Sequence, residues 1–163
     1  MSSTDWSAVR RIYQEGIDTG NATFETGPIT SWEEWCAKKI NSCSLVARED
    51  DAVIGWAAVS PVSNRPVYGG VAEVSVYVAS AARRRGVGSL LLEVLIRTSE
   101  KEGIWTLQGA IFPENLASLQ LHYKHGFREV GLREKLGKMK SGAYSGKWRD
   151  VVLVERRSRV VGI

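Results

Sequence analysis

The chain has 163 residues, a length typical of one domain, and we expect a single domain over residues 1–163 whose core needs no metal or disulfide. Its 44% hydrophobic and 25% charged residues exclude disorder along the whole chain. With no apolar run of about 18 residues and no secretion signal, we expect a cytoplasmic protein without a membrane partner. The net charge of +4 suits an anionic ligand but is too small for a dedicated nucleic-acid-binding protein, so we expect no nucleic-acid partner.

Two helices and a hairpin are predicted for the first part of the chain. Thr4 can cap a first helix, and an S-x-x-E capping box at Ser31 opens a second helix over about 31–41. The first helix is indicated by apolar residues that recur with helical spacing: Trp6, Val9, Ile12, Tyr13 and Ile17. Strands over 44–48 and 52–59 then flank a short acidic turn, which predicts a hairpin.

The second part of the chain alternates between strands and helices. A third strand is predicted over 71–79, with valines on one face and Glu73, Ser75 and Tyr77 on the other. The remaining elements follow in order: a helix over 87–101, a strand over 105–112, a short helix over 115–124, and strands over 127–133 and 148–155. The apolar stripe of the long helix is predicted to comprise Val87, Leu90, Leu91, Val94 and Leu95. This order predicts a mixed α/β fold without the regular βαβ alternation of a doubly wound sheet.

An arginine- and glycine-rich loop joins the third strand to the long helix. Its glycines allow the backbone to curl and to direct N–H groups at an anion, while the helix N-terminus and the arginines add positive charge. The loop therefore predicts a pyrophosphate cradle made by Arg83, Arg84, Arg85, Gly86, Val87, Gly88 and Ser89. A dinucleotide fingerprint would need glycine in place of Leu91, and a P-loop would need Gly-Lys-Ser/Thr. On spacing alone, an exposed arginine run before a helix remains the alternative.

The motif R-x-x-G-x-G at 83–88, preceded by Val-Tyr-Val, resembles the acetyl-CoA signature of the GNAT N-acetyltransferase superfamily. The motif N-x-x-S at 115–118, followed by Gly-Phe at 126–127, is similar to that family's second conserved segment. The resemblance extends over residues 6–155 and implies the GNAT acyl-CoA N-acyltransferase fold, with acetyl-CoA as co-substrate. That fold has a central, mostly antiparallel sheet with a splayed strand pair, flanked by helices. The family's usual first strand looks short or absent here, which would leave the strand at 44–48 with a bare edge.

Further local features resemble the phosphinothricin acetyltransferase branch of the superfamily. They are T-F-E at 23–25, R-x-x-Y at 65–68, E-V-S-V-Y-V at 73–78, L-H at 121–122 and G-K-W-R-D at 146–150. That branch acetylates the α-amino group of phosphinothricin, methionine sulfoximine, methionine sulfone and related amino acids, and its members are commonly homodimers. The resemblance implies direct transfer in a ternary complex to a small amino-acid-like substrate. The alternatives are acetylation of a peptide N-terminus, a polyamine or an aminoglycoside, or a non-enzymatic CoA- or nucleic-acid-binding module.

Two residues are candidates for proton transfer. Amine acetylation needs a neutral amine, and the resemblance places Glu73 where the acetyl group arrives, so Glu73 is the candidate base. Its alternative is an ordinary surface carboxylate. His122 is a second base, a proton relay or the acid for the departing thiolate, because histidine titrates near neutrality. Many superfamily members have tyrosine at this position, so the role of His122 stays open between these functions and a structural one.

The remaining candidates are binding residues, and no metal is expected. The resemblance places backbone groups of the third strand along the pantetheine arm and at the thioester oxygen. The expected cofactor contacts outside the glycine loop are Val76, Tyr77, Val78, Asn115 and Ser118. For the substrate, a guanidinium suits a carboxylate or phosphinate, and the expected contacts are Arg65, Tyr68, Phe24 and Ser75. Arg65 as an exposed arginine and Trp148 as a core, pocket or dimer residue are left open.

Overall fold

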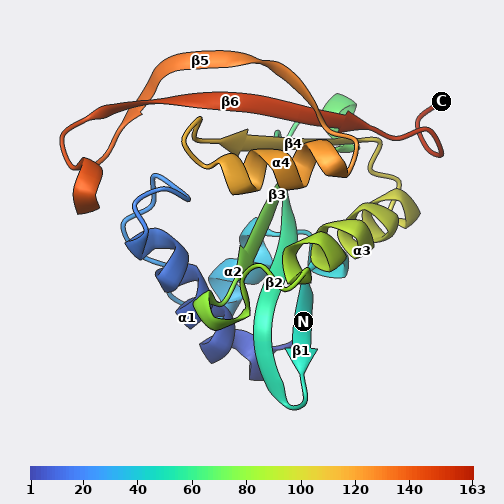
Figure 1. Cartoon of the computed structure of the whole chain (residues 1–163). Coiled ribbons are helices and arrows are strands. Elements are labelled where there is room, and N and C mark those ends of the chain that lie inside the picture. The colour runs from blue at the N-terminus through green and yellow to red at the C-terminus, as the bar shows by residue number, and fades with distance from the viewer.

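The computed structural model describes residues 1–163 and contains one six-stranded sheet with the strand order β1-β2-β3-β4-β6-β5 (Figure 1). The strands are β1 (Leu45–Glu49), β2 (Ala52–Pro61), β3 (Val71–Val78), β4 (Thr106–Ile111), β5 (Arg128–Lys138) and β6 (Trp148–Arg157). The helices are α1 (Trp6–Asp18), α2 (Trp32–Lys38), α3 (Val87–Lys101) and α4 (Leu116–Lys124). The β3–β4 pair is parallel and the other pairs are antiparallel, so the predicted mixed sheet is confirmed. None of the four helices has the length and apolarity to cross a membrane.

The element predictions hold in order and differ in detail at several ends. No strand precedes α1, and β1 pairs with β2 alone, so the outer edge of β1 is bare, as expected. Thr4 does not cap α1. It lies in a short 3-10 turn, where the Asp5 carboxylate accepts a hydrogen bond from the Ser2 N–H at 2.8 Å. Ser31 does cap α2, accepting from the Glu34 N–H at 3.1 Å, but the helix ends at Lys38 rather than near 41.

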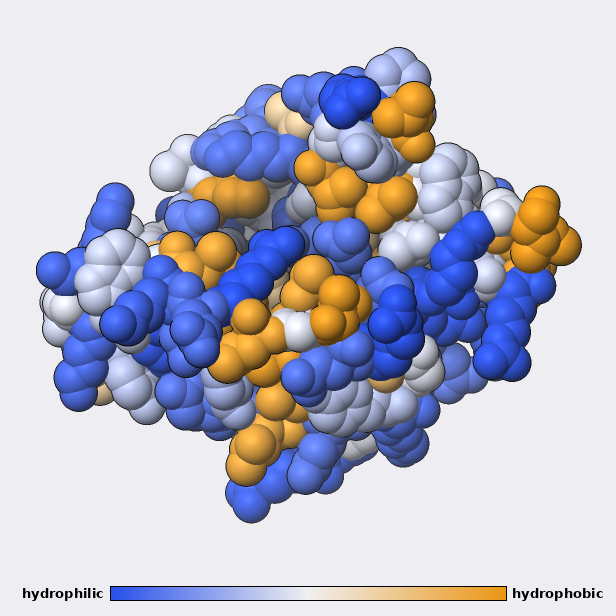
Figure 2. Space-filling view, turned by 90° about the horizontal axis from the view of Figure 1, so that it is seen from above, coloured by the Kyte–Doolittle hydropathy of each residue, from blue (hydrophilic) through white to orange (hydrophobic).

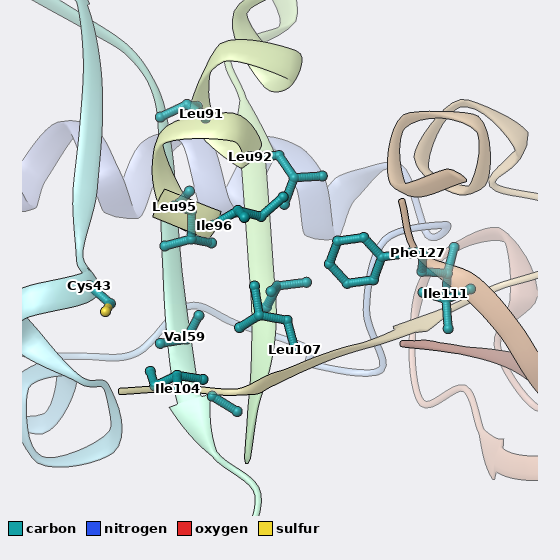
Figure 3. Packing of buried hydrophobic residues seen from close by; sticks show 14 of the residues in the cluster. Cys43, Val59, Leu91, Leu92, Leu95, Ile96, Ile104, Leu107, Ile111 and Phe127 are labelled. Atoms are coloured by element: carbon teal, nitrogen blue, oxygen red, sulfur yellow. The ribbon is translucent and has the colours of Figure 1, made fainter. Parts of the chain in front are cut away.

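Helices cover both faces of the sheet. On one face, α3 and α4 pack on the largest hydrophobic cluster, in which Leu91, Leu92, Leu95 and Ile96 of α3 meet Leu107 of β4 (Figure 3). The predicted stripe of α3 is therefore shifted. Leu90 and Val94 are exposed, and the residues that follow Leu91 and Leu95 are buried instead. On the other face, α1 and α2 pack on a second cluster built around Val9, Ile12, Trp35, Trp56 and Ala58.

The β5–β6 hairpin arches across the top of the molecule in Figure 1. Strand β5 is an edge strand whose residues are almost all exposed, and it runs to Lys138, five residues beyond the predicted end. Four large apolar residues of the hairpin are exposed: Val130, Leu132, Leu136 and Trp148. Figure 2 looks down on this side and shows apolar side chains gathered in patches among hydrophilic ones. Exposed apolar groups of this kind are typical of surfaces that meet another molecule.

The sheet opens between its two central strands. Strands β3 and β4 are paired only over 71–73 and 106–108, after which β3 continues to Val78 without a neighbour on that side. The predicted splayed strand pair is thus confirmed. Because α3 begins shortly after β3, the opening ends at the glycine loop.

Candidate active site

A run of free backbone N–H groups lies between β3 and α3. The N–H groups of residues 84–89 donate no hydrogen bond to the backbone, and the next one, that of Leu90, donates to the Gly86 carbonyl at 3.0 Å. Gly86 has a φ of 83° and Arg84 a φ of 61°, a left-handed backbone that turns successive N–H groups toward one side. Together with the positive end of α3, these donors form a cradle for an anion.

The polar side chains of this loop are held in different ways. Arg83 donates from Nε to the Val78 carbonyl at 3.3 Å, and Arg85 forms an ion pair with Glu49 of β1. Arg84 is exposed and forms neither a hydrogen bond nor an ion pair, so its charge is free for an anion in the cradle. Ser89 bonds through Oγ to His125 Nε2 at 2.8 Å, which ties the cradle to the end of α4.

The open edge of β3 carries unpaired backbone groups. Hydrogen bonds from Val62 N to Val71 O and from Ala79 N to Ile54 O show that the odd-numbered residues of β3 bond to β2. In an antiparallel pair the alternate residues direct their groups away, so the N–H groups of Val76 and Val78 face the opening toward β4. Tyr77 does not. Its N–H is directed at β2, and its side chain stacks on Trp56 with ring centroids 4.6 Å apart. Of the three predicted backbone contacts on β3, two residues, Val76 and Val78, present an N–H group to the opening.

His122 lies on the α4 side of the sheet and is 4% exposed. Its Nδ1 is 2.7 Å from the Ser118 carbonyl, and because a carbonyl only accepts, Nδ1 carries the proton. Nε2 then has a free lone pair, and it is buried without a partner. Burial lowers the pKa of His122, so the ring is neutral at pH 7. The ring lies against β4, since a Cβ on Gly109 would be 3.5 Å from Nε2.

The predicted Asn115 and Ser118 pair has structural partners within the chain. Asn115 caps α4, its Oδ1 accepting from the Ser118 N–H at 3.2 Å. Its Nδ2 donates to the Asn21 carbonyl at 3.0 Å, which fixes the loop after α1 against α4. Ser118 in turn orients His122 through its carbonyl. These two residues therefore build the frame around His122, and their predicted contact with the cofactor stays a prediction.

Glu73 and Ser75 lie on the opposite face of the sheet from His122, the face covered by α1 and α2. Glu73 is exposed and directly opposite Ser60 of β2, while its neighbour in β4 is Gln108. Lys39, the first residue after α2, reaches the same area, with Nζ 2.9 Å from Ser60 Oγ and 3.3 Å from Ser75 Oγ. Sequence analysis assigned no role to Lys39, because only the fold brings the end of α2 over β2 and β3.

The other three predicted substrate residues fall into two separate places. Phe24 packs edge-on against Phe112 at 4.8 Å and lies so close to β5 that a Cβ on Gly137 would come within 2.8 Å of its ring. Arg65 and Tyr68 lie in the exposed loop between β2 and β3, where the Arg65 guanidinium carbon is 5.4 Å from the Tyr68 ring centroid. The guanidinium makes no hydrogen bond or ion pair, so its role as a substrate clamp stays a prediction.

Arg149 is a buried cation to which sequence analysis assigned no role, although it lies in the G-K-W-R-D motif. It is 4% exposed and is held between the rings of Phe112 and Tyr144, each with its centroid 4.0 Å from the guanidinium carbon. It donates to the Gly20 carbonyl at 3.0 Å and to Asn21 Oδ1 and Glu114 Oε2, both at 2.8 Å. Arg149 thus ties β6 to the loop that carries Phe24. Its neighbour Trp148 is 57% exposed, which excludes the core interpretation for that residue.

A sheet that opens between two strands, with an anion cradle at the open end and a free strand edge leading inward, defines an acyl-CoA-dependent acyltransferase. The model of the acetyltransferase (GNAT) family matches residues 6–127, so the chain belongs to this family. The chain is 32% identical over 159 residues to a phosphinothricin N-acetyltransferase of Streptomyces coelicolor, covering 93% of this chain and 90% of that one. It is 24% identical over 156 residues to an L-methionine sulfoximine/L-methionine sulfone acetyltransferase of Pseudomonas aeruginosa, covering 93% and 88%.

A solved structure supports the same family assignment. A GNAT superfamily phosphinothricin acetyltransferase from Sinorhizobium meliloti, in complex with acetyl-CoA, matches with a TM-score of 0.84 and 29% identity over 96% of this chain and 85% of that one. The protein is therefore an acetyl-CoA-dependent N-acetyltransferase of the phosphinothricin and methionine sulfoximine branch, as the resemblance implied. Its own residues fit the co-substrate, because the free N–H groups of 84–89 match a pyrophosphate and the bare β3 edge matches an amide-containing arm.

Proposed function

We propose that the protein transfers the acetyl group of acetyl-CoA directly to the α-amino group of a small amino acid or analogue, of the phosphinothricin, methionine sulfoximine and methionine sulfone type. The observation that carries the proposal is the position of Glu73. It lies where the paired part of β3 ends and the open edge begins, on the sheet face opposite His122. The names of the two relatives support the acceptor class.

The proposed reaction uses groups on both sides of the opening. Glu73 removes a proton from the ammonium of the acceptor, and the amine attacks the thioester carbonyl. The tetrahedral adduct then collapses as the C–S bond breaks and the CoA thiolate leaves. The N–H groups of Val76 and Val78 stabilise the negative charge on the carbonyl oxygen. His122 is proposed to accept at Nε2 the second proton, which the nitrogen of the acceptor loses after its attack, since that atom is the lone-pair nitrogen. It acts as a relay first, and as an acid for the thiolate only after it has taken up that proton.

We also propose a homodimer that forms through the β5–β6 hairpin. The support is the set of exposed apolar side chains on this hairpin, which includes Leu132 at 49% and Trp148 at 57% exposure. Phe24, one of the expected substrate contacts, packs under β5 at Gly137, so the hairpin lies next to a proposed substrate residue. Light scattering after gel filtration measures the mass. A monomer at micromolar concentration contradicts this part of the proposal.

The experiment that tests the activity is release of the CoA thiol from acetyl-CoA with a panel of amines. The panel contains phosphinothricin, methionine sulfoximine, methionine sulfone, common amino acids, spermidine, an aminoglycoside and a peptide with a free N-terminus. We expect turnover with the first three compounds and identification of the N-acetyl products by mass. Turnover confined to spermidine, the aminoglycoside or the peptide refutes the proposed acceptor class and leaves the family assignment intact.

A further inference from the structure

Lys39 holds an ammonium group in an unusual environment for a lysine. The side chain leaves the end of α2, passes the Trp35 ring with Nζ 5.5 Å from its centroid, and ends over the sheet. Its partners are the hydroxyls of Ser60 and Ser75, at 2.9 and 3.3 Å, and no carboxylate lies within ion-pair distance. The adjacent Lys38, by contrast, is exposed and pairs with Glu34 at 2.6 Å.

The charge of Lys39 is thus only partly compensated by the chain itself. Burial lowers the pKa of this lysine, whereas the Glu73 charge raises it. Two neutral hydroxyls solvate an ammonium less well than water or a carboxylate does, so an anion placed against Nζ would be stabilised there. Lysine is well suited to this task as a compact charge with three donors, two of which already point at Ser60 and Ser75.

A cavity of about 300 Å³ borders Lys39 and Ser60. It lies between the end of α2, β2 and the loop after α1, which contributes Gly27, Pro28 and Ile29. Ser60 is directly opposite Glu73 in the β2–β3 pair, and side chains at such positions are roughly 5 Å apart at Cβ. Glu73 is not part of the cavity lining, but Ser60, which is, connects the cavity to the proposed base across the β2–β3 pair.

We propose that Lys39, with Ser60, binds the α-carboxylate of the acceptor amino acid and so places its amine at Glu73. The inference rests on the proposed function and specifies how that acceptor is recognised. In an α-amino acid the amine and the carboxylate are attached to one carbon, so the group that binds the carboxylate must lie a few ångströms from the base. Lys39 meets this condition through Ser60 and Ser75, which flank Glu73 on the same sheet face. The cation also disfavours polyamines, which have no carboxylate to offer it.

The test compares Lys39→Met with wild type on two acceptors, methionine sulfone and its carboxamide, which lacks the negative charge. Methionine preserves the unbranched stem that packs on Trp35. Lys101→Met is the matched control, because that lysine is exposed at the end of α3 and does not line the cavity. Unchanged thermal midpoint and unchanged KM for acetyl-CoA establish that Lys39→Met is folded and retains its co-substrate site.

We expect Lys39→Met to raise KM for methionine sulfone about tenfold or more, the usual effect of losing one charged hydrogen bond, and to leave KM for the carboxamide within about twofold. Lys39→Arg should recover part of the loss, and Lys101→Met should behave as wild type. Equal effects on the acid and the carboxamide, or no effect on either, overturn the inference. A wild-type enzyme that releases no thiol with any acceptor refutes the proposed function, and the inference fails with it. An active wild type, together with a Lys39→Met variant whose KM changes by the same factor for the acid and for the carboxamide, refutes the inference alone.

Discussion

Arg149 offers the sharpest test of how the substrate side of the site is built. Arg149→Met removes the guanidinium but leaves an unbranched chain between the Phe112 and Tyr144 rings. The variant loses two charged hydrogen bonds to neutral oxygens, those of Gly20 and Asn21, which are worth roughly 1.5 kcal/mol or more each. The pair with Glu114 adds less than about 1 kcal/mol, because that carboxylate is 53% exposed and screened by water. Burial of the methionine returns part of this loss, so we expect a net destabilisation of about 2–4 kcal/mol.

Urea unfolding measures this difference as a lower midpoint at unchanged slope, and it corresponds to a fall in Tm of roughly 5–15 °C for a chain of this length. Arg128→Met is the matched control. Arg128 is 70% exposed and pairs with Glu155 on the same hairpin, so its loss should cost less than about 1 kcal/mol. In assays below the unfolding range, Arg149→Met should raise KM for the acceptor more than KM for acetyl-CoA, since the loop of Phe24 loses its anchor. A stability loss no larger than that of Arg128→Met would refute the reasoning.

Three further predictions follow from the geometry. Glu73→Gln should lower kcat by about 100-fold or more with little change in acetyl-CoA affinity. Unchanged turnover of this variant in stopped-flow or steady-state assays would show that Glu73 is not the base. The pKa of His122 is lowered on folding, so the unfolded chain takes up its proton first as pH falls. Stability should therefore drop below about pH 6.5, and His122→Gln should flatten that part of a denaturation series against pH. Gly16→Ala should destabilise by about 1–2 kcal/mol in thermal melts, because the new Cβ would lie 2.6 Å from the Tyr77 ring, and a gain in stability contradicts the close approach.

The sequence predicts this fold well because its signals are local. The glycine loop and the apolar period after it predict a helix over 87–101, and both ends of this range match α3 in the structure. The stripe of α3 was less well predicted. Leu90 and Val94 fit a helical period as well as Leu92 and Ile96 do, and which side is buried depends on the sheet beneath it. Periodicity gives the width of an apolar face, while tertiary packing decides its orientation.

Candidate residues within one continuous motif could be predicted, whereas residues that the fold brings together from distant segments could not. The cradle at 84–89 is a continuous stretch of chain, so composition and spacing suffice to find it. Lys39 becomes significant only because α2 ends above Ser60 and Ser75, residues 21 and 36 positions away. Arg149 joins segments 35 and 128 or more positions apart. One weak signal existed in the sequence: Gly109 within a strand indicates a close approach, and the structure places His122 there.

The two-residue period of β3 explains how one strand serves both halves of the site. Its odd-numbered residues bond to β2 and direct Glu73, Ser75 and Tyr77 toward α1 and α2, where the acceptor is proposed to bind. Its even-numbered residues direct side chains into the core under α3 and leave the N–H groups of Val76 and Val78 at the opening. A one-residue insertion before Glu73 would exchange these two sets of residues. The Glu73 carboxylate would then be buried under α3, and the N–H groups of Val76 and Val78 would be directed at β2 instead of at the opening. The fold, the base and the thioester contact therefore depend on a single register, and none of them can be moved along β3 independently of the others.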